Sequence, residues 1–83
     1  MRRPHEPVEP ITDVEREVGH RLQALRIARG LSRAELASRL DTTEAEVIAW
    51  ETASEVIYVD ELTDICKVLQ ITPDTLLGWE TKQ

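Results

Sequence analysis

The stretch GLSRAELASRLDTTEAEVIAWE, from Gly30 to Glu51, contains the same short pattern twice. Ser32 is followed three residues later by Glu35, and Thr43 is followed three residues later by Glu46. This spacing is that of a capping box, in which a hydroxyl and a carboxylate satisfy the free amide groups at the start of a helix. The stretch therefore predicts two short helices that are separated by a turn of only two residues.

Outside this stretch, apolar residues recur at steps of three and four, the spacing that places side chains on one face of a helix. The pattern predicts a first helix from Thr12 to a capping glycine at Gly30, a fourth helix from about Val59, and a fifth from Pro73 to Gly78. Such amphipathic helices cover their apolar faces only by packing together. The residues expected to face inward are Val14, Val18, Leu22, Leu25, Ala28, Leu36, Ala37, Leu40, Val47, Trp50, Leu62, Ile65, Cys66, Leu69, Leu76 and Leu77.

The predicted fold class is all-α, a compact five-helix domain with an extended N-terminal arm. Residues 1–11 contain three of the four prolines, which favour an extended and flexible arm. Residues 12–79 are expected to form the single domain, with a connecting loop at 52–58. Residues 80–83 are expected to be a short C-terminal tail.

The charge of the chain is unevenly distributed. Its 83 residues carry a net charge of −6, yet all eight arginines lie at or before Arg39, and residues 42–60 contain five acids and no base. Phosphate binding requires a basic surface, so any contact with nucleic acid is expected from the part that carries the arginines. The sequence contains no apolar run that could span a bilayer and no secretory signal, so we expect a cytoplasmic location.

Residues suited to catalysis or metal binding are sparse. The two histidines, His5 and His20, lack the spacing of a zinc site, and the apolar neighbours of Cys66 favour a buried side chain over a reactive thiol. The acidic group from Asp60 to Asp64 lacks the glycine and the further oxygen ligands of a calcium loop. The sequence therefore predicts no enzyme activity and no cofactor.

A helix that follows another across so tight a turn leaves one face free, the geometry that enters a DNA major groove. The residues LQALRIARGLSRAELASRL, the V..WE that ends at Glu51, and LTDICKVLQITPDTLL resemble the lambda-repressor-like family, the Cro/CI-type or XRE helix-turn-helix. The resemblance runs without a gap from about Val18 to Leu77. It implies a small transcriptional regulator that binds operator DNA as a homodimer. It also implies a structural ion pair between Arg26 and Glu51.

The outward face of the third helix is expected to be short, apolar and acidic, because Val47 and Trp50 should face inward. Alanine and isoleucine can pack against thymine methyl groups, and glutamate can accept a hydrogen bond from cytosine. No Arg, Asn or Gln is present on this face to form a bidentate contact with a purine. Arginines of the second helix are suited to phosphate contact. The residues predicted to contact DNA are Arg33, Arg39, Thr43, Glu44, Ala45, Ile48, Ala49 and Thr52.

Two single positions and the segment after the third helix depart from the family pattern. Arg33 replaces the usual glutamine, and Asp41, which tolerates a left-handed backbone, replaces a glycine that is frequent in the turn. The family favours a basic residue, a glycine, further bases and a proline after the third helix, and the residues here are Thr52, Ala53, Ser54, Glu55 and Ile57. The usual phosphate-binding loop is therefore missing.

The remaining arginines fall into two groups. Arg2 and Arg3 in the arm are suited to phosphate or minor-groove contact, although arginines beside a start methionine are often incidental. Arg16, Arg21 and Arg29 are expected to balance nearby acids or to lie on a solvated face.

The candidates for homodimer contact are Tyr58, Leu77 and Trp79, of which Trp79 lies beyond the glycine that ends the fifth helix. The alternative function is a protein-interaction module, an adaptor, antagonist or antitoxin-like protein that keeps the fold with weak or no DNA binding. Its protein partner would contact the exposed face around Ile48. No membrane partner is expected.

Overall fold

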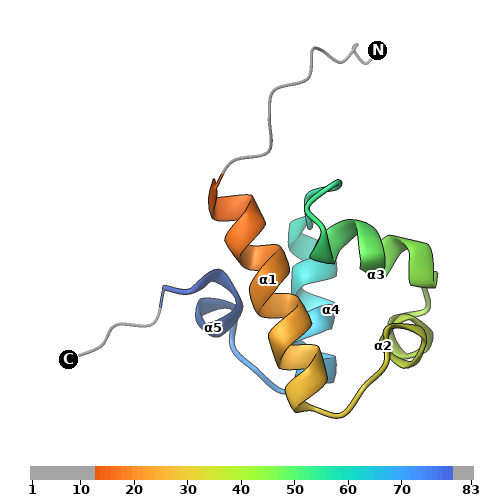
Figure 1. Ribbon diagram of the computed structural model, residues 1–83. Coiled ribbons are helices and arrows are strands. Elements are labelled where there is room, and N and C mark those ends of the chain that lie inside the picture. Colours follow the sequence, from red (N-terminus) through yellow and green to blue (C-terminus); the bar gives the residue numbers. More distant parts are fainter. Residues whose placement is uncertain (1–12, 80–83) are drawn as a thin grey trace.

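The computed structural model describes residues 13–79, and within this span the chain forms five α-helices and no strand (Figure 1). The all-α five-helix fold is therefore confirmed. The predicted arm at 1–11, the predicted cap Thr12 and the tail at 80–83 lie outside the described residues. The helices are α1 (Asp13–Ala28), α2 (Arg33–Leu40), α3 (Glu44–Glu51), α4 (Val59–Leu69) and α5 (Pro73–Leu77).

The predicted capping residues define the ends of α2 and α3. At α2 both halves of the capping box are present, because the Glu35 amide donates to Ser32 Oγ at 3.0 Å and the Ser32 amide donates to Glu35 Oε1 at 2.7 Å. At α3 the Glu46 amide donates to Thr43 Oγ1 at 3.1 Å. Because Thr43 satisfies the start of α3 locally, α3 begins directly after the short turn that follows α2.

The turn between α2 and α3 depends on Asp41, whose φ and ψ of 59° and 44° lie in the left-handed region. A left-handed backbone costs a residue with a side chain about 1–2 kcal/mol, and glycine escapes this cost. The Asp41 carboxylate also lies at the negative end of the α2 dipole, which costs a few tenths of a kcal/mol or more.

We expect Asp41→Gly to raise the free energy of unfolding by about 1 kcal/mol, since these two costs exceed the roughly 0.4–1 kcal/mol of extra chain entropy that glycine gives the unfolded state. Urea denaturation followed by circular dichroism measures the change. The control is Asp41→Asn, which removes the charge alone and should give a smaller gain. A glycine variant less stable than the wild type would contradict this explanation of the turn.

The core forms where the apolar stripes of the helices meet. Val47 and Trp50 face inward, as the spacing predicts, and Cys66 is buried, where desolvation raises the pKa of its thiol. The prediction was wrong for two residues of α1, because Val14 is 60% exposed and Ala28 is exposed. Each lies within two residues of an end of α1, where fewer neighbours cover the apolar stripe than in the middle of the helix. The fully buried large side chains are Leu22, Leu36, Val47, Ile65, Leu69 and Leu76.

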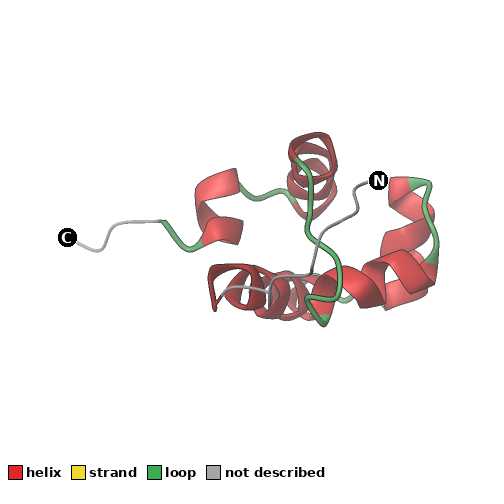
Figure 2. Cartoon of the chain, turned by 90° about the horizontal axis from the view of Figure 1, so that it is seen from above, coloured by secondary structure: helices red, strands yellow, loops and turns green. Residues whose placement is uncertain are grey.

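The helix pair α2–α3 lies at one end of the molecule, and α5 lies at the other, with α1 and α4 between them (Figures 1 and 2). α1 packs against α3 and α5, and α2 packs against α3 and α4. Glu44, Ala45 and Ile48 of α3 are exposed, so the side of α3 that carries them is open. None of the helices within residues 13–79 is long and apolar enough to cross a membrane.

α1 and α3 approach closely at Gly19, which is buried near the middle of α1. A Cβ atom on Gly19 would lie 2.6 Å from the carbonyl oxygen of Trp50 and 2.9 Å from that of Glu51. Both oxygens belong to the backbone, so neither can rotate away. The apolar spacing of α1 does not distinguish Gly19, although a lone glycine inside a helical pattern often has a packing reason. This contact holds the C-terminal end of α3 against α1.

Candidate nucleic-acid interface

Four of the residues that the sequence predicted to contact DNA, Glu44, Ala45, Ile48 and Ala49, lie on α3. Glu44 and Ala45 are exposed, as is the N-cap residue Thr43, and Ile48 is 36% exposed. Ala49 is half-buried, so it contributes little exposed surface to this face. The face is therefore narrow, with Ile48 as its large apolar side chain.

The loop after α3 turns back on the end of that helix. The Ala49 carbonyl oxygen accepts hydrogen bonds from the amides of Ser54 and Glu55 at 2.9 and 3.2 Å. Ala53 adopts a left-handed backbone with a φ of 61°, at the position where the family favours glycine. Thr52 Oγ1 donates to the Ile48 carbonyl oxygen at 2.8 Å. Thr52 therefore uses its hydroxyl hydrogen on its own helix, so a base or phosphate would meet an acceptor at this position.

Arg33 does not extend freely from the start of α2. Its Nε donates to Glu51 Oε1 at 2.9 Å, and Glu51 also accepts bonds from Nε and Nη2 of Arg26 at 2.6 and 3.2 Å. Arg26 Nη1 in turn donates to the Leu31 carbonyl oxygen at 2.8 Å. The side chain of Glu51 is 1% exposed, and it contacts two guanidinium groups where the family resemblance implied one. Spacing along the chain gave no sign of the Arg33 contact, because it joins two helices.

Arg39 supplies the second positive charge of α2. It is exposed in the last turn of the helix, and no ion pair within residues 13–79 involves it. The pKa of the nearby Glu35 carboxyl is lowered from 4.5, first by hydrogen bonds from Ser32 and to a lesser extent by the charge of Arg39. Arg39 is therefore the exposed cation of α2 that remains available to a ligand.

The arginines of α1 differ in what they contact. Arg16 and Arg21 lie 3.9 Å from Asp13 and 3.6 Å from Glu17, so they pair with local acids as predicted. Arg29 is exposed, in line with the predicted solvated face, but it also makes contacts that the sequence did not predict. Its Nε donates to the Leu69 carbonyl oxygen at 2.6 Å, and its Nη2 donates to that of Gln70 at 3.2 Å. Arg29 therefore caps the C-terminal end of α4, which comes near only after folding.

Carboxylates crowd together on the side of α3 that adjoins α4. The pKa of Glu46 is raised from 4.5, first by burial and then by the nearby carboxylates of Glu55 and Glu61, against a smaller lowering influence of Trp50. The Trp50 Nε1 is buried without a hydrogen bond of acceptable geometry. Within residues 13–79 none of these three acids has a salt bridge. No group of acids, histidines or cysteines there is arranged to hold a metal ion. This side is therefore unfavourable for DNA.

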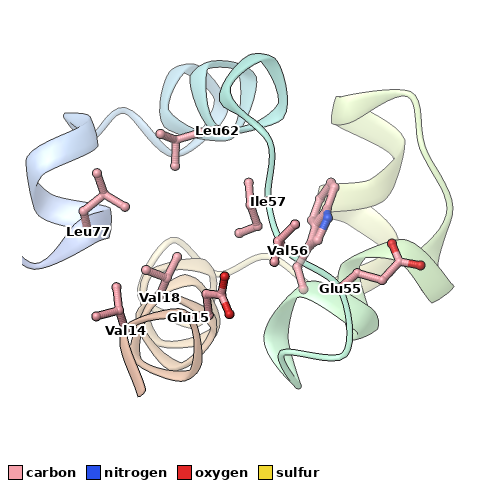
Figure 3. Close-up of a pocket in the computed structure, with 9 residues that line it drawn as sticks. Val14, Glu15, Val18, Glu55, Val56, Ile57, Leu62 and Leu77 are labelled. Carbon is pink, nitrogen blue, oxygen red and sulfur yellow. The ribbon is translucent and has the colours of Figure 1, made fainter. Parts of the chain in front are cut away.

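A second surface of interest is an apolar pocket away from α3's outward face (Figure 3). The side chains of Val18, Ile57, Leu62 and Leu77 point toward a common space between α1, α5, α4 and the loop at 52–58 (Figure 3). Leu77 lies in this pocket and is half-buried. The pocket is lined by Val14, Glu15, Val18, Trp50, Glu55, Val56, Ile57, Leu62 and Leu77.

The chain segments that line the pocket also carry large exposed apolar side chains. Tyr58 is 65% exposed, Val59 is 78% exposed and Trp79 is 66% exposed. The sequence predicted Tyr58, Leu77 and Trp79 as dimer contacts but missed Val59, which follows directly on Tyr58. An accumulation of exposed apolar side chains often indicates a contact surface.

The short turn, the capped start of α3 and its open outward face define α2–α3 as a helix-turn-helix. Domains of this class place their second helix in the DNA major groove. A family model, the Cro/C1-type HTH DNA-binding domain, matches residues 21–82, and the chain belongs to this family. The family predicted from the sequence is thereby confirmed.

Several solved structures share the fold, whereas no curated protein matches the chain. The restriction-modification controller protein C.AhdI from Aeromonas hydrophila has a TM-score of 0.71 and 28% identity, over 77% of this chain and 91% of C.AhdI. The clp gene regulator ClgR from Corynebacterium glutamicum has a TM-score of 0.77 and 18% identity, over 86% of this chain and 91% of ClgR. FeII HppE, solved with its substrate, has a TM-score of 0.68 and 28% identity, over 75% of this chain but only 36% of HppE. Likeness over most of both chains is thus to gene regulators.

Proposed function

We propose that the protein is a small cytoplasmic transcriptional regulator that binds operator DNA as a homodimer and is not an enzyme. In this arrangement α3 lies in the major groove and α2 crosses the phosphate backbone. The observation that carries the proposal is the helix pair itself. Its outward residues Glu44, Ala45 and Ile48 are exposed, and the preceding helix α2 supplies the cations Arg33 and Arg39. Membership of a DNA-binding family supports it.

The homodimer follows from the size of the interface. A single domain of this kind buries little surface on DNA, and a symmetric pair that reads two half-sites about one helical turn apart increases both affinity and site length. The apolar pocket and the exposed Tyr58 and Trp79 supply a surface that a second copy would cover. The pocket lies between α1, α4, α5 and the loop at 52–58, and Glu44, Ala45 and Ile48 do not line it, so a dimer formed there would leave the outward face of α3 open.

A protein-interaction module remains the second candidate function. It is favoured by the three crowded carboxylates beside Trp50 and by the absence of any base on α3. In this case the exposed Ile48 would be the centre of a protein contact.

Genome-wide capture of DNA fragments tests the proposed function with three variants. Ile48→Glu places an acid on the reading face, and Arg39→Glu removes the exposed cation of α2. Arg33→Glu is unsuitable because it would place a second carboxylate against the buried Glu51. Lys67→Glu, on the exposed side of α4, is the matched control for a lost base.

We expect the wild type and Lys67→Glu to enrich the same sites, and both other variants to lose them. With Arg33 and Arg39 of two copies on four phosphates, affinity should fall on the order of a hundredfold between 50 and 200 mM salt. If the wild type enriches no site, and a protein co-purifies unless Ile48 is changed, the module is the correct function.

A further inference from the structure

The buried Glu51 carboxylate lies between two arginines that come from different helices. Arg26 of α1 occupies both of its oxygens, and Arg33 of α2 donates from Nε to Oε1 at 2.9 Å. Two positive charges and one negative charge leave this group with a net charge of +1. The group formed by Arg26, Arg33 and Glu51 is called the arginine cluster below.

Arg33 is the arginine of this cluster that is partly exposed to solvent. The side chain of Arg26 is 8% exposed, and its Nη1 is engaged by the Leu31 carbonyl oxygen, whereas the side chain of Arg33 is 33% exposed. Arg33 directs Nε inward to Glu51, and no other hydrogen bond of its guanidinium is formed within residues 13–79. Because a guanidinium is planar with five donors, the two terminal nitrogens form the outer edge when Nε is engaged.

The position of Arg33 suits a phosphate ligand. It is the first residue of α2, directly after the N-cap Ser32, and the start of a helix favours anions through its free amides and its dipole. The one carboxylate in this first turn, Glu35, is engaged by the Ser32 amide. Two parallel terminal N–H groups match two oxygens of a phosphate.

We propose that Glu51 is a positioning residue for DNA binding, which holds the Arg33 guanidinium by Nε so that both terminal nitrogens face a backbone phosphate. This inference rests on the proposed DNA binding and adds a role to a residue of the core. A lysine at position 33 has one ammonium group, which can approach either Glu51 or the phosphate. The structure therefore distinguishes arginine from lysine at a position where charge alone would not.

The test compares Arg33→Lys and Arg33→Gln with the wild type in binding to a mixed-sequence 30-base-pair duplex at several salt concentrations. Arg39→Lys is the matched control, because no salt bridge within residues 13–79 involves Arg39. Removing one phosphate contact from each of two copies should lower the slope of log affinity against log salt by about 1.8. We expect this reduction in Arg33→Gln and in Arg33→Lys alike, and no reduction in Arg39→Lys.

A nuclear magnetic resonance experiment on the free protein accompanies the binding series. The Arg33 Nε–H signal should be protected from exchange in the wild type and should stay protected when the duplex is added. Thermal unfolding shows that each variant is folded, and a purely structural role of Arg33 would change the melting temperature without changing the salt slope.

The outcomes separate the two proposals. If Arg33→Lys keeps the wild-type slope, or if Arg33→Gln does, Glu51 does not position Arg33 for phosphate and the proposed function stands. If the wild type itself shows no salt-dependent binding, both the proposed function and the positioning role are wrong.

Discussion

Replacing Glu51 by alanine is expected to lower the free energy of unfolding by about 3–5 kcal/mol, the cost of leaving a buried charge without its partner. The side chain of Arg26 is 8% exposed and depends on Glu51 for two of its hydrogen bonds. Arg33 loses its contact as well. Since the total free energy of unfolding of such a domain is only about 5–15 kcal/mol, the variant should lose a large part of its stability. Thermal unfolding measures the effect, and we expect the melting temperature to fall by more than about 10 °C.

Two further variants define what the Glu51 result means. Glu17→Ala removes an exposed acid that lies 3.6 Å from Arg21 and is 60% exposed. Its loss should be below about 1 kcal/mol, because water screens an exposed pair. Glu51→Gln keeps the shape and one acceptor and should fall between the two. An unchanged melting temperature in Glu51→Ala would show that the pair contributes nothing to the fold.

The substitution Gly19→Ala should destabilise the protein by about 1–3 kcal/mol, the usual cost of overpacking. The new methyl group would lie 2.6 Å from the Trp50 carbonyl oxygen and 2.9 Å from that of Glu51. To relieve these contacts α3 must move away from α1, which disturbs the neighbouring Arg26–Glu51 pair. The measurement is chemical denaturation of the wild type and the variant under identical conditions.

This prediction opposes the one that helix propensity alone would give. Alanine is better than glycine inside a helix by about 1 kcal/mol, so without α3 the change would stabilise α1. Ala24→Gly is the control, because Ala24 is exposed in the same helix and should simply lose that amount. A Gly19→Ala variant more stable than the wild type would show that α1 and α3 are farther apart than described.

The two experiments concern the same junction between α1 and α3. Gly19 permits the close approach of the backbones, and the arginine cluster joins the side chains beside it. The junction also holds the C-terminal end of α3 against α1, so it contributes to how α3 is presented in the proposed DNA binding. A destabilised junction should therefore weaken the proposed DNA binding even where the outward residues are unchanged.

Much of the fold could be predicted from the sequence because the signals are local. The capping box at Ser32 and Glu35, the glycine at Gly78 and the apolar steps of three and four act within one or two helical turns. Local hydrogen bonds and side-chain spacing suffice to define where such helices begin, end and face. The resemblance to the lambda-repressor-like family added the expectation of how these helices are arranged into one domain.

The properties of the candidate site depend on contacts between residues far apart in the chain. The sequence placed Arg33 among the DNA contacts but gave no sign that its Nε is held by Glu51, 18 positions later. It likewise predicted that Arg29 balances local acids or lies on a solvated face, and gave no sign that Arg29 donates to the carbonyl oxygen of Leu69, 40 positions later. Neither contact follows from a periodic spacing of residues, so neither can be predicted from residues a few positions away in the chain.

For this protein the sequence by itself determined the helices, their inward faces and the helix-turn-helix class. Only the tertiary structure decided that Gly19 must stay without a side chain, that Glu46, Glu55 and Glu61 crowd together, and that Arg33 is held by Glu51. The physical reason is the distance along the chain between the residues that interact. Caps and periodicity depend on neighbours a few residues away, whereas backbone clearance, charge crowding and shared carboxylates depend on which helices meet in space.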